Sequence, residues 1–150
     1  MYRQSIFAAL IFFIILFTGC GRTMPEGLGL NDNALAKCPN SPNCVSTQSQ
    51  KEEAKIEPIK YKINDKTAYK LLLQVIESNK LANVISKTNN YIHAAYYTKS
   101  KIFIDDVEFY IDSTTNTIHF RSASRVGHSD LGANRKRMES IRSEFLQQQQ

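Results

Sequence analysis

The sequence lacks the short motifs that mark the commonest enzyme classes. It has no glycine-rich phosphate loop, no dinucleotide-binding fingerprint and no GxSxG segment around a serine nucleophile. Histidine is scarce, and His93, His119 and His128 are scattered along the chain, so a zinc ion would lack a compact set of ligands. The motifs therefore predict no cofactor, no metal ion and no catalytic residue.

Long hydrophobic runs are also missing. The run from Ile6 to Phe17 has no polar residue but is only twelve residues long, whereas a membrane-spanning helix needs about 20 apolar residues. Arg3 precedes this run, and Gly19 and Cys20 follow it. A basic start, a short apolar run and small residues at its end are typical of an export signal. We assign this signal to residues 1–19.

The end of the run, Phe17-Thr18-Gly19-Cys20, resembles the lipobox of bacterial lipoproteins. The resemblance implies cleavage before Cys20, a diacylglyceryl thioether on its sulfur and an acyl group such as palmitate on the new amino terminus. Several acyl chains anchor a protein stably, whereas a single chain binds only marginally. Gly21 follows in place of aspartate, which in Gram-negative lipoproteins favours the outer membrane. We therefore expect a cell-envelope protein whose partner is the membrane, at the periplasmic face of the outer membrane if the cell is Gram-negative.

Cysteine is rare, and the odd count of three leaves one residue to explain. If Cys20 carries lipid, Cys38 and Cys44 are the only remaining thiols, and an oxidising envelope favours their pairing. Pro39 and Pro42 bend the short loop between them. Redox pairs are usually spaced CxxC, unlike this CxxxxxC segment. We predict a structural disulfide.

The segment between the lipidated cysteine and the disulfide shows no period of 2 or 3.6, so we predict that residues 20–37 comprise the lipidated cysteine and a flexible tether over residues 21–37. Seventeen flexible residues span about 20–25 Å. Residues 38–146 then form the single domain, and the glutamines of residues 147–150 form a disordered tail.

The domain is predicted to be an α+β two-layer sandwich with the order β-α-β-β-β-β-α. Alternation and helical periodicity give five strands, over residues 59–63, 81–87, 91–98, 102–111 and 117–122, and two helices, over residues 64–79 and 130–146. An antiparallel sheet of about five strands should carry both helices on one face. The buried stripes are expected to be Ala68, Leu71, Leu72, Val75 and Ile76 in the first helix and Leu131, Met138, Ile141 and Phe145 in the second.

The register of the last hairpin follows from its pattern, because a slip of one residue exchanges the two faces of a strand. Pairing Ile111 with Ile118 and Phe109 with Phe120 places apolar residues opposite apolar residues. The same register sets Glu108 opposite Arg121, an expected cross-strand ion pair, Asp105 opposite Ser124, and Tyr110 opposite His119.

A dense set of opposite charges surrounds this hairpin and the start of the last helix. Cations are unfavourable at the N-terminus of a helix, so an anion should offset the basic residues at the start of this helix. One candidate is internal: Asp105 or Asp106, with Asp130 as the cap, bonds to Arg125 and Arg135. The other is an external anion bound by these arginines and by the amides of the helix N-terminus. The internal network is favoured because the carboxylates are close in sequence. The whole set comprises Asp105, Asp106, Glu108, Arg121, Arg125, Asp130, Arg135 and Arg137.

Three segments, Cys38–Ser46, Phe103–Phe109 and Arg121–Arg137, together resemble the domain-of-unknown-function family numbered 1499. The resemblance covers about residues 35–146. This family has no settled activity, so the resemblance implies a domain and not a mechanism.

We expect a non-enzymatic binding or scaffolding module with an arginine-rich, anion-accepting rim. Because its net charge is +5, an exported chain would meet anionic lipids or cell-wall polymers before nucleic acid. The alternative is an envelope hydrolase, which requires a pocket where Asp105 or Asp106 meets His93 or His119. The consecutive residues His128, Ser129 and Asp130 do not form a triad, since neighbours point apart; Ser129 and Asp130 are better explained as helix caps.

Overall fold

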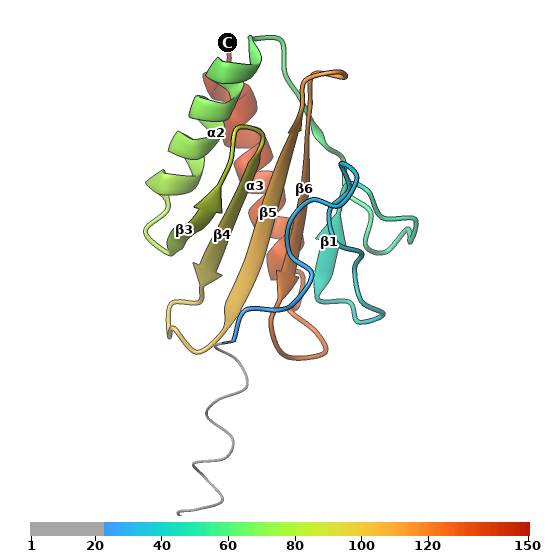
Figure 1. Cartoon of the computed structure of the whole chain (residues 1–150). Helices are drawn as coiled ribbons and strands as arrows, with labels where there is room; N and C mark the ends of the chain where they lie inside the picture. The colour runs from blue at the N-terminus through green and yellow to red at the C-terminus, as the bar shows by residue number, and fades with distance from the viewer. Residues whose placement is uncertain (1–22) are drawn as a thin grey trace, which may run out of the picture.

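The computed structural model describes residues 23–150, so the predicted signal of residues 1–19 and Cys20 lie outside the described residues. The described chain folds around one antiparallel sheet (Figure 1). The sheet order is β1-β6-β5-β4-β3, and β2 pairs directly with the first residues of β6, whereas β1 pairs with later residues of that strand. The strands are β1 (Cys44–Ser46), β2 (Ile59–Lys60), β3 (Ala82–Lys87), β4 (Tyr91–Tyr97), β5 (Ile104–Asp112) and β6 (Thr117–Ser124).

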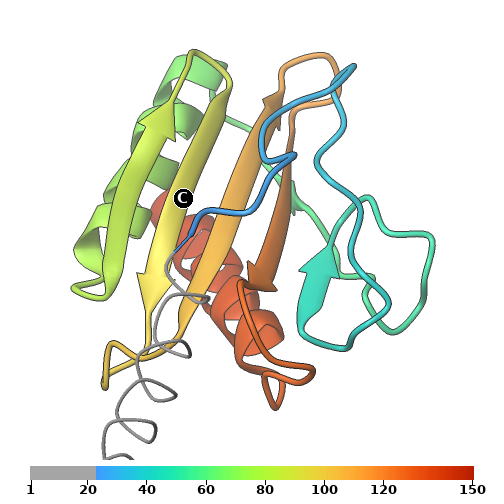
Figure 2. The ribbon, with the colours of Figure 1, turned by 60° about the horizontal axis from the view of Figure 1, so that its bottom comes forward.

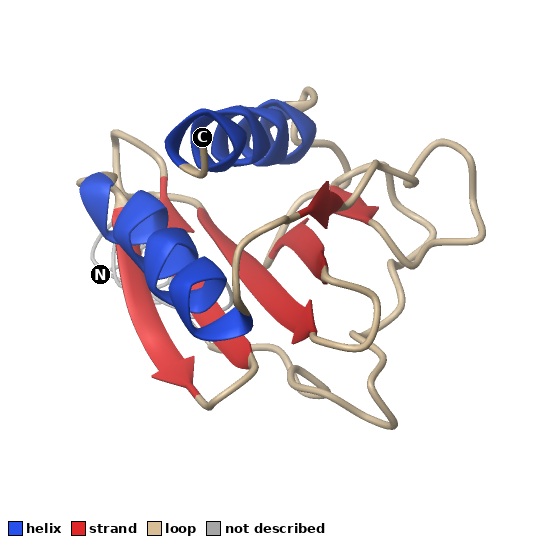
Figure 3. Ribbon diagram, turned by 90° about the horizontal axis from the view of Figure 1, so that it is seen from above, coloured by secondary structure: helices blue, strands red, loops and turns tan. Residues whose placement is uncertain are grey.

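Two helices, α2 (Asp65–Ser78) and α3 (Ala133–Gln148), lie together on one face of the sheet (Figures 2 and 3). The side chain of Asn64 accepts a hydrogen bond from the amide of Thr67 and caps α2. Neither helix is long and apolar enough to cross a bilayer, and the same holds for every helix within residues 23–150. The predicted two-layer α+β class is therefore confirmed.

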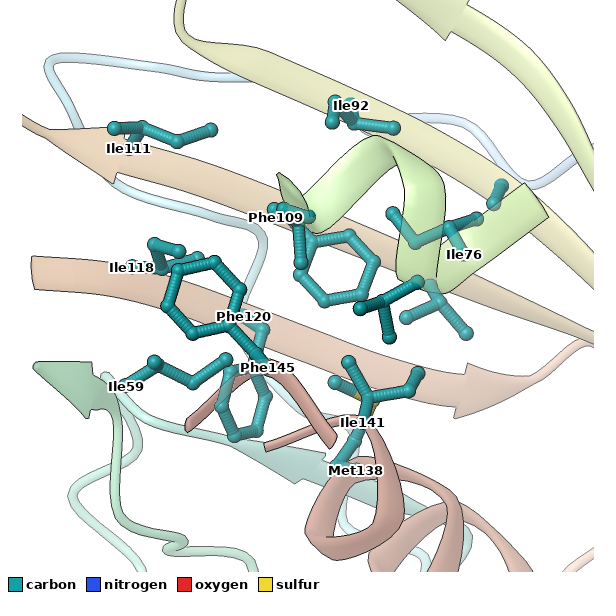
Figure 4. Close-up of a cluster of buried hydrophobic side chains, with 14 of the residues drawn as sticks. Ile59, Ile76, Ile92, Phe109, Ile111, Ile118, Phe120, Met138, Ile141 and Phe145 are labelled. Carbon is teal, nitrogen blue, oxygen red and sulfur yellow. The ribbon is translucent and has the colours of Figure 1, made fainter. Parts of the chain in front are cut away.

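The main core fills the space between the sheet and the helices (Figure 4). It forms because alternate residues of β4, β5 and β6 face the helices, while an apolar stripe of each helix faces back. Phe109 and Phe120 lie on neighbouring strands with ring centroids 6.4 Å apart. The labelled core residues are Ile59, Ile76, Ile92, Phe109, Ile111, Ile118, Phe120, Met138, Ile141 and Phe145.

The predicted hairpin register is confirmed at each of the pairs named above. Ile111 lies opposite Ile118, Phe109 opposite Phe120 and Glu108 opposite Arg121. The period-2 pattern was sufficient here because the wrong register would have placed charges in the core. Consequently, Asp105 faces the helices, whereas Asp106 and Glu108, which are two residues apart on β5, both point to the opposite face of the sheet.

Several sequence predictions differ from the structure. The short strand β1 was not predicted, and it adds a sixth strand to the expected five. Helix α3 begins at Ala133 instead of Asp130, because Leu131 and Gly132 have positive φ angles, which a right-handed helix does not accommodate. Leu131 is consequently 96% exposed rather than buried. The expected disordered tail is wrong in part, since α3 continues to Gln148.

The predicted flexible tether is wrong from Gly29 onward. This segment crosses the face of the sheet opposite the helices (Figures 1 and 2). The amide of Gly29 donates to Glu108 Oε1 at 2.8 Å. Leu30 and Leu35 pack against the rings of Tyr91 and Tyr110, forming a second, small core. The folded unit therefore begins well before the disulfide.

The disulfide joins Cys38 to Cys44, with Cα atoms 5.7 Å apart. It lies where the N-terminal segment turns into β1, and Cys44 pairs with Ala123 of β6. The bond thereby links the segment that covers the open face to the sheet itself.

Candidate functional site

The acidic residues of β5 are divided between the two faces of the sheet. Asp106 and Glu108 share the face that the N-terminal segment crosses, and Asp105 points to the helices. Each has an arginine partner on a neighbouring element. The predicted charged set is thus divided among several separate clusters.

The first cluster, on the N-terminal face, centres on Asp106. His93 Nε2 donates to Asp106 Oδ1 at 2.8 Å, and Arg125 donates from Nε and Nη2 to both carboxylate oxygens at 2.8 Å each. His93 and Asp106 are 2% and 1% exposed. Burial opposes ionisation, but the bonds from His93 and Arg125 outweigh it and hold the pKa of Asp106 below its usual value.

The second cluster centres on Glu108, which is fully buried. Its Oε1 accepts hydrogen bonds from the Tyr91 hydroxyl and the Gly29 amide, both at 2.8 Å. Its Oε2 accepts from Arg121 Nη1 at 3.3 Å. Burial, reinforced by the charge of Glu108, raises the pKa of Tyr91 well above its usual value. The expected Glu108–Arg121 pair is therefore present, and it also holds the N-terminal segment.

The third cluster lies under the helices and centres on Arg137. Arg137 Nη2 donates to Asp105 Oδ2 at 2.5 Å, and its Nη1 donates to Asn134 Oδ1 and Ser122 Oγ. The guanidinium also lies over the ring of Tyr96, 4.9 Å from its centroid. Burial raises the pKa of Tyr96 to about 12, although the charge of Arg137 acts in the opposite direction.

Asn134, a fully buried residue that the sequence did not single out, connects α3 to the sheet. Its Nδ2 donates to the carbonyl of Asn43 at 3.0 Å and to Ser124 Oγ at 3.1 Å. The one available signal was its place four residues before Met138, on the same face of the helix.

The start of α3 is stabilised by Asp130. Asp130 Oδ2 accepts from the amide of Asn134 at 2.7 Å, and its Oδ1 accepts from the amide of Gly132 at 3.0 Å. This carboxylate offsets the cations of the first turn. Arg135 departs from the expected carboxylate network: its Nη2 donates to the carbonyls of Glu53 and Lys55, at 2.9 Å each.

The remaining residues that could suggest catalysis have structural contacts. Ser129 Oγ accepts from the amide of Leu131 at 3.2 Å, as a turn residue would. His119 stacks on Tyr110, with ring centroids 6.1 Å apart and planes 16° apart. Its Nδ1 lies 3.2 Å from Thr47 Oγ1. Burial lowers the pKa of His119 below its usual value.

The cavities lie away from these clusters. The largest one described has a volume of about 840 Å³ and lies between the start of α2 and the β3–β4 turn, lined by residues such as Tyr69 and Asn90. Within residues 23–150, no group of three or more His, Cys, Asp or Glu side chains is arranged to bind a metal ion. The arrangement is that of buried pairs that hold elements together.

Comparison with known proteins places this arrangement in a family. Residues 34–145 match the family described as "Protein of unknown function (DUF1499)". Searches of the curated proteins and of the solved structures found no match. The matched region contains the disulfide, the six strands and nearly all of α3. Since it covers well over half of the sequence, this chain belongs to the DUF1499 family.

Proposed function

We propose that this chain is a lipid-anchored cell-envelope protein that serves as a binding or scaffolding module and not as an enzyme. The observation that carries the non-enzymatic part is the burial of the charged residues. Asp106, Glu108 and His93 are each at most 2% exposed and are bonded to neighbouring side chains. A general acid or base must reach a substrate proton directly or through one water. Residues enclosed in this way stabilise the fold instead.

The lipid anchor is supported by the lipobox-like residues that end in Cys20. The test is to express the full chain and its Cys20→Ser variant in a bacterium, label the cells with palmitate and separate membranes from soluble protein. The wild-type chain should carry the label and sediment with membranes, and the variant should lose both properties. Equal labelling of the two chains would show that the lipid is not attached to Cys20.

The anion-accepting rim is tested by charge reversal at two arginines that differ in their contacts. Arg125 is bonded to the buried Asp106, whereas Arg135 bonds only to backbone carbonyls at the surface. We expect Arg125→Glu to unfold the domain. Arg135→Glu should leave the fold intact and weaken binding to vesicles of anionic phospholipid or to an anionic cell-wall polymer. Unchanged binding by a folded Arg135→Glu variant would show that Arg135 does not contribute to anion binding.

One contact favours the second candidate, an envelope hydrolase. His93 lies 2.8 Å from Asp106, which is the meeting of histidine and aspartate that such an enzyme requires. The pair lies on the face that the N-terminal segment crosses, so this segment would have to move to admit a substrate (Figure 2). A screen of the full chain with activated esters, beside its His93→Gln variant, distinguishes the candidates. Hydrolysis that the variant abolishes, while its circular dichroism is unchanged, would favour the hydrolase.

A further inference from the structure

One end of the sheet presents apolar side chains to solvent on two separate loops. The β4–β5 loop and the β6–α3 loop leave the sheet at the same end, because Asp105 at the start of β5 pairs with both Tyr96 and Ser124. Ile102 and Phe103 on the first loop are 67% and 49% exposed. Leu131 on the second is 96% exposed. We call this end of the domain, formed by residues 98–103 and 125–132, the loop end.

The distribution of exposed apolar residues is strongly one-sided. Within residues 23–150, five large hydrophobic side chains are exposed, and Ile102, Phe103 and Leu131 are three of them. A fourth, Met24, belongs to the start of the described chain, which lies at the same end in Figure 1. Only Ile85, on the edge strand β3, lies elsewhere. Scattered exposed apolar residues are ordinary, but a cluster of them indicates a contact surface.

The backbone at this end is held in an unusual conformation. Leu131 has φ of 53° and Lys101 has φ of 56°. Non-glycine residues in this region are usually asparagine or aspartate, as at Asn33 and Asn116 of this chain. A leucine side chain that is almost completely exposed and has a strained backbone does not stabilise the domain through packing. Its place is better explained by a partner that covers it.

The charges at this end identify the kind of partner. Lys99 and Lys101 come just before Ile102 and Phe103 in the sequence, and Lys80 and Lys101 line one small cavity of about 260 Å³ beside Tyr97. Asp130, the acidic residue of the β6–α3 loop, accepts hydrogen bonds from the backbone amides of Gly132 and Asn134. Apolar side chains next to lysines are suited to a membrane interface, where the former enter the acyl region and the latter meet anionic headgroups.

The path of the chain brings this same end to the bilayer. Thr23 is three residues after Cys20, and an extended chain advances about 3.3–3.6 Å per residue. If Cys20 carries the lipid, Thr23 therefore lies within about 10 Å of the lipid-bearing residue. Gly29, the first residue bonded to the sheet, lies nine residues from Cys20 and thus within about 30 Å of it.

We propose that the loop end docks on the lipid bilayer, with Ile102, Phe103 and Leu131 inserted at the headgroup–acyl boundary and Lys80, Lys99 and Lys101 on anionic headgroups. This inference rests on the proposed lipid anchor, since the anchor supplies the proximity. The docked orientation directs the β5–β6 turn, at the opposite end of the sheet, away from the membrane (Figure 1).

The test uses the absence of tryptophan from the sequence. The lipid-modified full chain is reconstituted into vesicles that contain anionic phospholipid and brominated acyl chains, with a single reporter in each variant. Phe103→Trp and Leu131→Trp place the reporter at the loop end, and Thr114→Trp places a control in the exposed β5–β6 turn. Docking inserts the first two about 5–10 Å into the boundary, so bromine should quench them and should leave the control unquenched.

A charge test accompanies the reporter. Lys80→Glu combined with Lys101→Glu should reduce the quenching of the Leu131→Trp reporter in anionic vesicles and leave it unchanged in zwitterionic ones. The matched control, Lys62→Glu combined with Lys66→Glu, makes the same change of charge at the other end of α2 and should have no effect. Circular dichroism verifies the fold of each variant.

The outcomes separate this inference from the anchor on which it rests. Chains that float with the vesicles, but whose loop-end reporters are quenched no more than the control, keep the anchor and overturn the docking. Loop-end emission that shifts to shorter wavelength without quenching by bromine means that protein covers this end, which also overturns it. Chains that do not float with vesicles refute both the anchor and the docking.

Discussion

The buried pair of Asp106 and Arg125 gives the strongest single prediction about stability. The Asp106→Ala substitution removes a carboxylate that is 1% exposed and accepts bonds from Arg125 and His93. Arg125 remains in place with its side chain 7% exposed and without the carboxylate. Breaking a buried ion pair by removal of one partner destabilises a protein by about 3–5 kcal/mol, a large part of the about 5–15 kcal/mol by which a domain is stable.

The assay is urea denaturation of residues 23–150, followed by circular dichroism because the chain has no tryptophan. The matched control is Glu139→Gln, which breaks the pair between Glu139 and Arg142 on the surface of α3. An exposed helical pair of this kind contributes about 0–1 kcal/mol. The double variant Asp106→Ala/Arg125→Met should be more stable than Asp106→Ala alone, because it also removes the buried charge whose carboxylate partner the single variant lacks.

The dependence on pH provides a second readout of the same pair. The pKa of Asp106 is lowered in the folded state, so the unfolded chain takes up a proton first as pH falls. The contribution of Asp106 is then complete above about pH 4, its unfolded pKa, and is lost as pH falls through the lower folded pKa. The gap between wild type and Asp106→Ala should shrink below about pH 4. A loss of less than about 1 kcal/mol at pH 7, equal to that of the Glu139→Gln control, would refute the structural role of the pair.

Three further predictions concern the disulfide, a buried histidine and the core. Replacing Cys38 and Cys44 by alanine should lower the free energy of unfolding by about 2.4 kcal/mol in the chain-entropy model for a loop of this length; a reductant should destabilise the wild type by a similar amount and leave the double variant unchanged. Because burial lowers the folded pKa of His119, its contribution to stability should be complete above about pH 6.5 and fall as pH drops below that value, and His119→Gln should flatten the stability curve below about pH 6.5; parallel curves for the two chains would contradict this. Phe145→Ala should cost about 3–5 kcal/mol because Phe145 is fully buried in the core, whereas Leu131→Ala should change stability by less than about 0.5 kcal/mol, and equal losses would show that the burial is wrongly assigned.

The hairpin of β5 and β6 was predictable because local pattern alone determines it. Ile111, Phe109 and their partners alternate with polar residues, and one register satisfies every position. The place of His93 beside Asp106 was not predictable in the same way. It depends on the β4–β5 register, and β4 is buried on both faces, so its residues show no alternation of apolar and polar types.

The N-terminal segment was misinterpreted for a related reason. It docks through the backbone amide of Gly29 and through Leu30 and Leu35, and neither contact leaves a period in the sequence. Similarly, Leu131 fits the apolar stripe of α3 by spacing. The left-handed backbone at Leu131 and Gly132 removes it from the helix, and spacing alone carries no signal for this.

The charged residues show how much of the candidate site could be predicted from the sequence. It correctly paired Glu108 with Arg121 and predicted that Asp105 or Asp106 bonds to an arginine. It was wrong for Arg135, which donates to backbone carbonyls. It did not assign Arg125 and Arg137 to their faces of the sheet, because that requires the path of the chain after β6. Arg125 continues on the face of Asp106, whereas Arg137 reaches Asp105 from α3.

The claim that the chain is a lipid-anchored envelope protein is tested most directly by the mass of its amino-terminal peptide. The full chain, expressed in a bacterium that processes lipoproteins, is extracted from membranes with detergent and digested, and its first peptide is analysed by mass spectrometry. The account predicts a peptide that begins at Cys20 and carries a diacylglyceryl group and an amide-linked acyl chain. A peptide that begins at Met1, or an unmodified Cys20, would contradict it.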